Sequence, residues 1–444
     1  MFGGASLMSM NSDIFMEYAF AAMIILIGVE AFFSFWKDRG YYRVNVLIAD
    51  VSNGVIFALA GIGILVGALF CYNWLESNFS LSQIGIQLFP LLSPFSLEPN
   101  FTVHWNVLAA WVFSIVLADF IYYWFHRHTH TINILWACHV THHSTEEMNL
   151  SVAFRGNAFQ RIFEYTYFLP MAMLGIPWEM FFLSHRILKV YQFFVHTRFV
   201  GKLGFLELFM VTPSNHRVHH GTQRKYLDRN HGGIFIIWDK LFGSFEEETD
   251  EVIYGLTKPV RTFNPITLNL HVYSEILANM KKARNWSDRL KLVFKEPGWK
   301  PDYMITPEDE FKEPAYLEKY DPKTPLNVMI YVILQAIVLV SVGLLIWKVA
   351  KLDVTQGWPL IIVGSFVVFS LVSINRTMEM KKWSKRSEVI RNIILVGFLV
   401  GVAVYFHIPA IVYLSIPLLA LALASLFWIV VKRKTFYSYS LATS

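Results

Sequence analysis

The sequence predicts an all-α protein, a polytopic bundle of helices that cross a membrane. Two observations support this prediction. Hydrophobic residues make up 55% of the 444 residues, and the mean hydropathy of +0.43 is higher than soluble domains show. Several apolar runs also reach the ~20 residues that a helix needs to cross a bilayer. Both observations fit a helical membrane protein.

Seven apolar runs account for most of this hydrophobicity. Each is roughly long enough to span a hydrocarbon core of ~30 Å, and they lie near residues 14–36, 47–72, 104–125, 327–348, 358–375, 389–406 and 410–431. A further apolar stretch, residues 160–188, is interrupted by Pro170, Gly175 and Pro177. We expect this stretch to form a hairpin of two shorter helices that enters the membrane and returns.

The positions of the basic residues predict how these spans are oriented. No Lys or Arg occurs between Arg43 and Arg127, whereas basic residues gather at 37–43, 376–386 and 432–434. Under the positive-inside rule the N-terminus lies outside, and the C-terminus and the region after the third span face the cytoplasm. The membrane would be the endoplasmic reticulum in a eukaryote or the inner membrane in a bacterium. Because the basic residues flank apolar spans, we expect no nucleic-acid partner.

Three short sets hold eight of the fifteen histidines. The sets are His126-x-x-x-His130, His139-x-x-His142-His143 and His216-x-x-His219-His220. On a helix, spacings of three and four place side chains on one face, so each set aims two or three imidazoles at one point. Clustered imidazoles repel each other once protonated and need hydrogen-bond partners when neutral, and a metal ion removes that penalty. One such set is usually chance, but three sets together predict a metal site.

A ninth ligand is predicted at His196, because Gln192-x-x-x-His196 repeats the four-residue spacing of the first set. Nine imidazoles, with a water held by Gln192, would give two metal ions about five ligands each, which is within the range that non-haem iron uses. We interpret the remaining histidines of this half of the chain as structural, surface or supporting groups, namely His104, His128, His185, His231 and His271.

The nearly all-imidazole set favours iron over other metals. Structural zinc sites usually contain cysteine, but the chain has only Cys71 and Cys138. Bundle di-iron proteins of the ferritin type use glutamate-rich motifs instead. An all-nitrogen set with open coordination positions suits ferrous iron that binds O₂. A site next to a membrane span could receive a lipid, whose C–H bonds need a strong oxidant. The sequence therefore predicts two iron ions in a cytoplasmic, histidine-rich cap on the membrane bundle.

Five polar residues are candidates for a supporting role around the metal ligands. Asp119 lies two helical turns before His126, where it could accept the free N–H of a ligating histidine or pair with another buried polar group. The other four candidates are Gln192, Glu146, Asn149 and Asp239. No catalytic residue is predicted beyond the metal ligands.

The segments around the histidines resemble the fatty acid hydroxylase / sterol desaturase superfamily of membrane di-iron enzymes. Within that superfamily the linking segments are most similar to the alkylglycerol monooxygenase subfamily. The similarity lies in residues 119–127, 136–144, 149–151, 191–197, 212–221, 236–245 and 254–257. It is strong over roughly residues 105–300, and it extends weakly to the layout of the flanking spans.

This resemblance implies a membrane monooxygenase that uses O₂ to hydroxylate the ether-bearing carbon of an O-alkylglycerol lipid. The product would then fall apart to a fatty aldehyde and glycerol. The resemblance also implies tetrahydrobiopterin as the reductant, and it carries the metal-ligand role onto the nine histidines named above. The residues that would bind a pterin are not predicted.

Other functions remain as alternatives to this one. A sterol or fatty-acyl hydroxylase or desaturase of the same superfamily would take its electrons from a separate electron-donor protein. A metal transporter would place ionisable groups near the middle of several spans. A bis-histidine haem protein would use single histidines on facing helices rather than tight sets.

The changes in composition along the chain predict three parts. Residues 1–103 would hold the first transmembrane helices and an outer loop, and residues 104–325 the catalytic domain with its cytoplasmic cap. Residues 326–444 would form a C-terminal group of transmembrane helices that is accessory to the chemistry.

Overall fold

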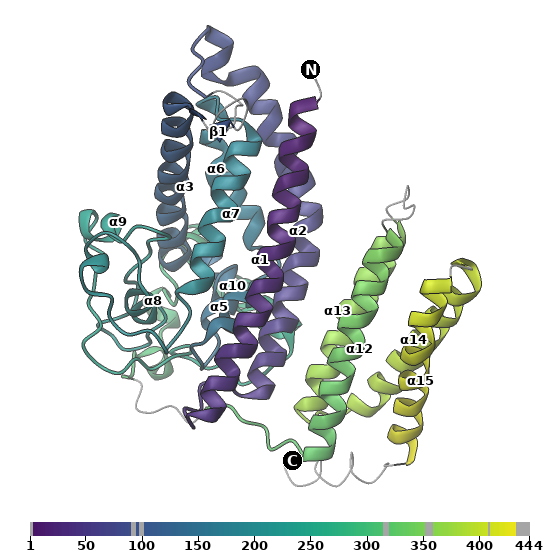
Figure 1. The fold of residues 1–444 in the computed structure, drawn as a ribbon. Coiled ribbons are helices and arrows are strands. Elements are labelled where there is room, and N and C mark those ends of the chain that lie inside the picture. Colours follow the sequence, from purple (N-terminus) through teal and green to yellow (C-terminus); the bar gives the residue numbers. More distant parts are fainter. Residues whose placement is uncertain are drawn as a thin grey trace. The chain divides into compact units, whose positions relative to one another are not determined.

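The computed structural model describes residues 3–89, 95–96, 102–313, 319–350, 358–406 and 409–431, and the regular secondary structure of these residues is almost entirely helical (Figure 1). The strands within them are β1 (Phe95–Ser96) and β2 (Thr102–Val103), which form one short antiparallel pair. The predicted all-α membrane fold is therefore confirmed. His407 and the basic cluster at 432–434 lie outside the described residues.

The longer helices carry the membrane-spanning and packing surfaces, and they are α1 (Gly3–Trp36), α2 (Val44–Phe79), α3 (Trp105–Thr131), α6 (Gln160–Met173), α7 (Trp178–Phe194), α10 (Pro265–Lys282), α12 (Leu326–Ala350), α13 (Trp358–Met378), α14 (Ser384–Phe406) and α15 (Pro409–Val431). The short α-helices are α4 (Asn133–Ala137), α5 (Val140–His143), α8 (Pro213–His219), α9 (Ile237–Leu241) and α11 (Trp286–Phe294). Five 3₁₀ turns complete the described elements: η1 (Leu81–Ile84), η2 (Leu150–Phe154), η3 (Gly204–Leu208), η4 (Asp302–Met304) and η5 (Pro307–Asp309).

Five apolar helical stretches within the described residues are long enough to cross a bilayer. They are Tyr18–Trp36, Val44–Ile84, Trp105–Thr131, Leu326–Gly343 and Ile361–Met378. Large apolar side chains on these stretches remain exposed in the folded chain, as expected for surfaces that contact lipid. Helices α14 and α15 coincide with the other two predicted runs, although the apolar part described in α15 is the shorter stretch Ser415–Val431. The chain is an integral, multi-pass membrane protein.

The chain folds into two compact units. The first contains residues 1–43, 53–260 and 269–318, and it holds all three histidine sets. The second contains residues 44–52, 261–268 and 319–444. The three-part division by role, with boundaries at 103 and 325, stays a prediction.

The interrupted stretch 160–188 forms two helices, as expected. Helix α6 tolerates Pro170 in its last turn, and α7 begins directly after Pro177, whose ring suits a helix start. Gly175 between them has φ +81°, a left-handed conformation that glycine adopts without strain. The turn therefore reverses the chain in a few residues, and α6 and α7 both pack against α3 (Figure 1).

The apolar core of the first unit lies where α3, α6 and α7 meet. Phe125 from α3, Phe168 from α6 and Phe181 from α7 are almost completely buried there. Tyr72 from α2 stacks on Phe181 with ring centroids 5.0 Å apart, and its hydroxyl donates to the carbonyl of Ile176 (2.8 Å). This core fixes the end of α3 from which the first two histidines project.

The second unit contains a buried polar network between α12 and α14. Arg391 is almost fully buried and donates to the Glu388 carboxylate (2.8 Å). It also donates to the side chain of Gln335, and Tyr331 donates to Glu388. Because each charged group has partners, this pair can remain inside an apolar bundle.

Candidate metal centre

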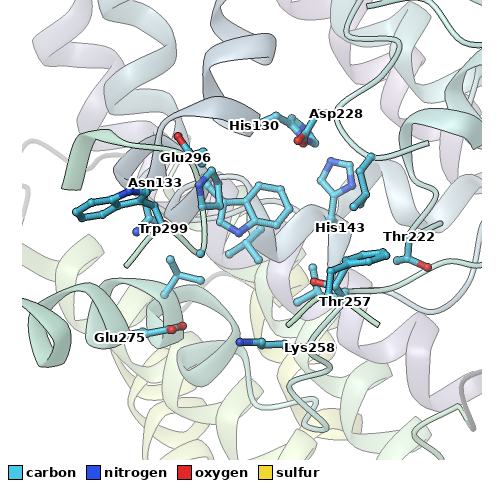
Figure 2. Close-up of a pocket in the computed structure, with 18 of the residues that line it drawn as sticks. His130, Asn133, His143, Thr222, Asp228, Thr257, Lys258, Glu275, Glu296 and Trp299 are labelled. Atoms are coloured by element: carbon cyan, nitrogen blue, oxygen red, sulfur yellow. The ribbon is translucent and has the colours of Figure 1, made fainter. Parts of the chain in front are cut away.

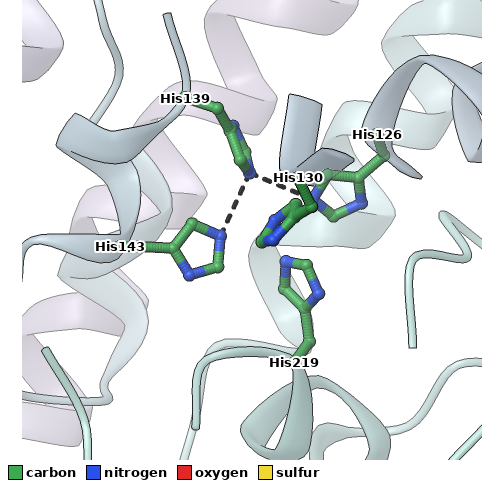
Figure 3. Close-up of side chains that lie close together, drawn as sticks. All are labelled: His126, His130, His139, His143 and His219. Carbon is green, nitrogen blue, oxygen red and sulfur yellow. Dashed lines mark hydrogen bonds between the residues drawn. The ribbon is translucent and has the colours of Figure 1, made fainter. Parts of the chain in front are cut away.

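The first histidine group gathers five imidazoles from three segments (Figure 3). Each offers one ring nitrogen, and these nitrogens all lie within 4.8 Å of one another. His126 and His130 stand one turn apart at the end of α3, while the other three members come from α5, from the residue before it and from α8: His143, His139 and His219. All five side chains are buried.

The second group gathers four imidazoles, and the ring nitrogens that they offer also lie within 4.8 Å of one another: His142, His196, His216 and His220. The last three are buried, and His142 is partly buried. His196 follows the end of α7, and the last two lie on and directly after α8. The structure therefore brings together all nine histidines that the sequence singled out, in one group of five and one of four.

The two His-x-x-His-His sets divide between the groups in opposite ways. In the set on α5, His139 and His143 belong to the first group, and His142 belongs to the second. In the set on α8, the outer pair of histidines, 216 and 220, belongs to the second group and residue 219 to the first. Residues four apart on a helix lie closer in angle than residues three apart, so each outer pair shares one direction. Each helix therefore contributes to both groups.

Helix α8 is short, and its first turn is fixed by local hydrogen bonds. Thr212 and Asn215 form a reciprocal capping box, and Pro213 occupies the first helical position. These features satisfy the free backbone N–H groups at the helix start. The first residues of α8 thus stabilise the short helix that positions the three histidines at 216, 219 and 220.

Backbone carbonyls fix the orientation of several imidazoles. The Nδ1–H of His126 donates to the carbonyl of His231 (2.8 Å), and that of His219 donates to the carbonyl of Arg229 (3.0 Å). In the second group, His142 donates to Arg155 (3.0 Å) and His196 donates to Gln192 (2.6 Å) in the same way. A neutral imidazole carries one proton, so each of these rings presents an unprotonated Nε2 to the centre of its group.

Ring nitrogens of neighbouring histidines face each other at short distances. The Nε2 atoms of His142 and His196 lie 3.2 Å apart, and that of His216 lies 2.9 Å from His196. In the first group the Nε2 of His139 lies 3.0 Å from His126 and 3.1 Å from His143 (Figure 3). Because Nδ1 is the donor in both His142 and His196, their facing Nε2 atoms both carry lone pairs, which repel each other unless a cation lies between them. Ligands at right angles on one metal ion, each about 2.1 Å from it, are about 3.0 Å apart.

Further buried ring nitrogens have no hydrogen-bond partner among the described residues. They include Nε2 of His130, His219 and His220. Buried polar atoms are nearly always satisfied in folded proteins, so a cluster of unsatisfied acceptors calls for an explanation. The donor set and its spacing fit metal ions, and an almost all-nitrogen set is consistent with iron.

Burial keeps these histidines neutral. Removal from water, together with the charge that neighbouring imidazoles would carry, lowers the pKa well below the ordinary 6.5 for His139, His142, His143, His216, His219 and His220. Burial also lowers the pKa of His196 to about 4. Neutral imidazole is the form that binds a metal, so the site is prepared for metal at neutral pH.

Two buried carboxylates hold the loop that supports His126. Asp119 accepts hydrogen bonds from the backbone of Ile234 (2.6 Å) and from the indole of Trp238 (2.9 Å). Asp239 accepts from the backbone of His231 (2.7 Å), whose carbonyl in turn accepts from His126. Asp119 thus binds this loop rather than a histidine N–H, which is the second of the two arrangements expected for it. Its effect on the metal ligand is transmitted through the loop backbone.

The other supporting candidates have different partners. The side-chain amide of Gln192 donates to the carbonyl of Gly233, so it is engaged with the same loop, while its backbone carbonyl orients His196. Glu146 pairs with Arg43 (3.3 Å), and Asn149 donates to the carbonyl of Tyr41 (2.7 Å). A Cβ atom at position 233 would collide with the Asp119 carboxylate. The close approach of the loop to α3 therefore depends on glycine at this position.

The other described histidines belong to neither group. His231 is buried, with its ring centroid 5.0 Å from that of His130, and His185 pairs with Glu164 (3.0 Å). His128 contacts the hydroxyl of Tyr167 (2.8 Å), and His104 is an exposed residue before α3. The carbonyl acceptors could not be predicted from the sequence, because any residue can supply a carbonyl.

A cavity of about 610 Å³ opens beside the histidine groups (Figure 2). His130, His143, His219 and His220 form part of its wall. The rest of the wall comes from α4, α10 and the segments near 255–258 and 296–312. The candidate centre is therefore connected to a space that can hold a reactant.

Comparison with known proteins agrees with this site. The family model described as fatty acid hydroxylase matches residues 111–244, which include all nine histidines. Alkylglycerol monooxygenase of Xenopus tropicalis is 31% identical over 380 residues, which cover 85% of this chain and 80% of that protein. The Homo sapiens enzyme of the same name is 35% identical over 60% of this chain and 55% of that protein. Ornithine lipid hydroxylase of Rhizobium tropici is 27% identical over 53% of this chain and 71% of that protein. No solved structure matches the chain.

The membrane helices and the paired histidine groups define an integral-membrane oxidoreductase of the fatty acid hydroxylase type. The extent of similarity then fixes the family: the chain belongs to the alkylglycerol monooxygenase family. It is an oxygen-dependent membrane monooxygenase that acts on lipid.

We expect replacement of His196 by alanine to lower the metal content of the purified protein. Its Nε2 lies beside those of His142 and His216, so its loss removes one quarter of the second group. Metal analysis of protein reconstituted in lipid nanodiscs would measure this. His128→Ala, which removes a histidine outside both groups, should retain the wild-type metal content. Equal metal loss in both variants would contradict the assignment.

We expect the metal-free protein to lose stability as the pH falls below about 6.5. The folded chain keeps these histidines neutral because their pKa values are depressed, whereas the unfolded chain takes up protons near the ordinary value. Each such group adds a slope of up to about 1.4 kcal/mol per pH unit in the window between its two pKa values. Thermal unfolding from about pH 8 to about pH 5 should show a flat and then a falling Tm. The Tm of a variant with asparagine at 142, 196 and 216 should fall less steeply with decreasing pH. An unchanged dependence of Tm on pH would refute this explanation.

Proposed function

We propose that the chain cleaves O-alkylglycerol lipids. In this reaction one atom of O₂ is inserted into a C–H bond of the carbon next to the ether oxygen. The resulting hemiacetal collapses to a fatty aldehyde and glycerol. The observation that carries the proposal is the pair of buried histidine groups at the end of a membrane helix, in a chain of this family.

We propose that the groups of five and four histidines hold two iron ions, one in each group. Bound iron would supply the O₂ activation that an unreactive C–H bond requires. The chain's own residues hold the imidazoles in one tautomer through the carbonyls of residues 155, 192, 229 and 231. They also bury the ligands, which limits the access of water to the centre.

The reaction needs an external source of electrons. Insertion of one oxygen atom into the lipid and reduction of the other to water consume O₂, two electrons and two protons. We propose tetrahydrobiopterin as the donor, since its oxidation to a dihydropterin releases two electrons and two protons. A separate electron-donor protein is the alternative source.

Ether lipid is favoured as the substrate by chemistry as well as by family. The ether oxygen donates electron density to the adjacent carbon, which stabilises the electron-deficient centre that forms when hydrogen is removed. The lipid would approach along α3, whose apolar part leads directly to His126 and His130. We propose that this centre faces the cytoplasm, in the endoplasmic reticulum of a eukaryote or the inner membrane of a bacterium.

The substrate proposal is tested with purified protein in nanodiscs, iron, tetrahydrobiopterin and ¹⁸O₂. We expect the ether lipid to release fatty aldehyde whose oxygen carries the label, measured after immediate reduction to the alcohol. An alkane of equal length should react at least about tenfold more slowly, which corresponds to about 1.4 kcal/mol in activation free energy. His219→Ala should release no aldehyde. Oxygenation of a sterol or fatty-acyl lipid with a redox-protein donor, without aldehyde from ether lipid, would contradict the proposal.

The proposed orientation is tested by labelling single cysteines in sealed vesicles. The background would carry Cys71→Ser, because Cys71 is exposed whereas Cys138 is buried. Cysteines introduced at Gln87 and Lys225 should be labelled from opposite sides by a membrane-impermeant reagent, because α3 separates them and is long enough to cross the bilayer. Labelling of both positions from the same side would refute the orientation.

A further inference from the structure

Four histidines of the two groups line one part of this cavity, and charged, aromatic and apolar side chains line the rest. In the view of Figure 2, His130 and His143 lie above, and Glu275 and Lys258 lie below. Any molecule in this cavity would lie directly against four of the nine histidines. Helix α3, whose apolar part is long enough to cross a bilayer, ends at the same histidines.

The charges around the cavity are predominantly negative. Among the described residues, three lysines line it, and two of them, Lys258 and Lys300, are already paired with Asp309 (2.9 and 2.7 Å). Six carboxylates line it, namely Asp228, Glu275, Glu296, Glu308, Asp309 and Glu310. This balance disfavours ligands that carry phosphate, such as nicotinamide nucleotides and phospholipid head groups. It favours a neutral molecule with several N–H or O–H donors, because carboxylates accept strong hydrogen bonds.

Two indole rings add a preference for a flat ligand. Trp136 lines the cavity and packs against His130 and His143, with ring centroids 5.2 and 5.6 Å away. Trp299 lines the cavity from the 296–300 turn and remains partly exposed. Aromatic faces attract planar heterocycles by stacking. Together, the rings and the carboxylates describe a planar, neutral ligand that is rich in hydrogen-bond donors.

We propose that this cavity is the binding site of the water-soluble reductant, a reduced pterin, and that the lipid reaches the centre by the separate membrane approach. The proposal rests on the proposed function, which requires a two-electron donor close to the centre. A tetrahydropterin has a flat pyrimidine ring, no phosphate and several N–H donors. Bound here, it would release its two electrons and two protons next to the histidine groups and leave as a dihydropterin.

Anaerobic calorimetry of the iron-loaded full chain in nanodiscs tests the proposal, with tetrahydrobiopterin as the probe. We expect Trp299→Leu to raise the Kd for the pterin about tenfold. Trp299→Phe, which keeps a flat ring, should stay within about threefold of wild type. The matched control is Trp286→Leu, since Trp286 is 71% exposed on α11 and does not line the cavity. It should leave the Kd unchanged.

The charge argument is tested with the double variant Glu275→Gln/Glu296→Gln. We expect weaker binding of the pterin and tighter binding of NADPH, because the change removes acceptor strength and repulsion together. Asp302→Asn, an exposed acid outside the cavity, is the control. Iron content and Tm show that each variant is folded.

The outcomes separate this inference from the proposed function. If the pterin binds with these variant effects but no aldehyde forms from ether lipid, the substrate proposal fails and the pterin site stands. If aldehyde forms but Trp299→Leu changes neither the Kd nor the KM for pterin, the cavity proposal is wrong. A Trp299→Leu effect confined to binding of alkylglycerol, or to a donor protein, would also overturn it.

Discussion

The crowding of nine imidazoles into two groups is the constraint on which the rest of this protein depends. Facing ring nitrogens approach to about 3 Å, and in one pair, Nε2 of His142 and of His196, both nitrogens lack a proton. Such an arrangement is unfavourable in the metal-free chain, so the surrounding structure must hold it until a cation relieves it. Three features hold the histidines in place. They are the apolar core of α3, α6 and α7, the capping box of α8, and the hydrogen bonds from the loop at 231–235 to Asp119 and Asp239.

The support for the ligands comes mainly from the backbone. Carbonyls fix the outer nitrogens of four histidines, and two carboxylates fix the loop that supplies one of those carbonyls. A carbonyl held in a folded loop has little freedom, so it orients a ring more rigidly than a long side chain would. Asp119 influences the orientation of His126 without contacting it, because it accepts hydrogen bonds from three N–H groups and so holds the loop that supports His126.

The features that follow from local periodicity were predictable from the sequence. Apolar runs gave the long helices, Pro170, Gly175 and Pro177 gave the hairpin, and the spacing of the histidines gave nine residues that the fold brings together. The opposite division of the two His-x-x-His-His sets was not predictable, because it depends on how α5 and α8 are oriented in space. The partners of Gln192, Glu146 and Asn149 were likewise not predictable, since they lie far away in sequence or on the backbone. The cavity wall combines residues from 130 to 312, which no local pattern connects.

A monooxygenase of this kind must bring an apolar lipid, O₂ and a polar electron donor to one centre. A single channel would suit neither the lipid nor the polar donor, because the lining that attracts one repels the other. In this fold the third membrane helix ends at the first histidine set, while carboxylates and two indoles line the cavity beside the histidines. The short sets on α5 and α8 allow both approaches, since each helix contributes ligands to both groups without closing the space beside them. Under the proposed function, this sharing of ligands between two groups would leave the centre open to two chemically different reactants.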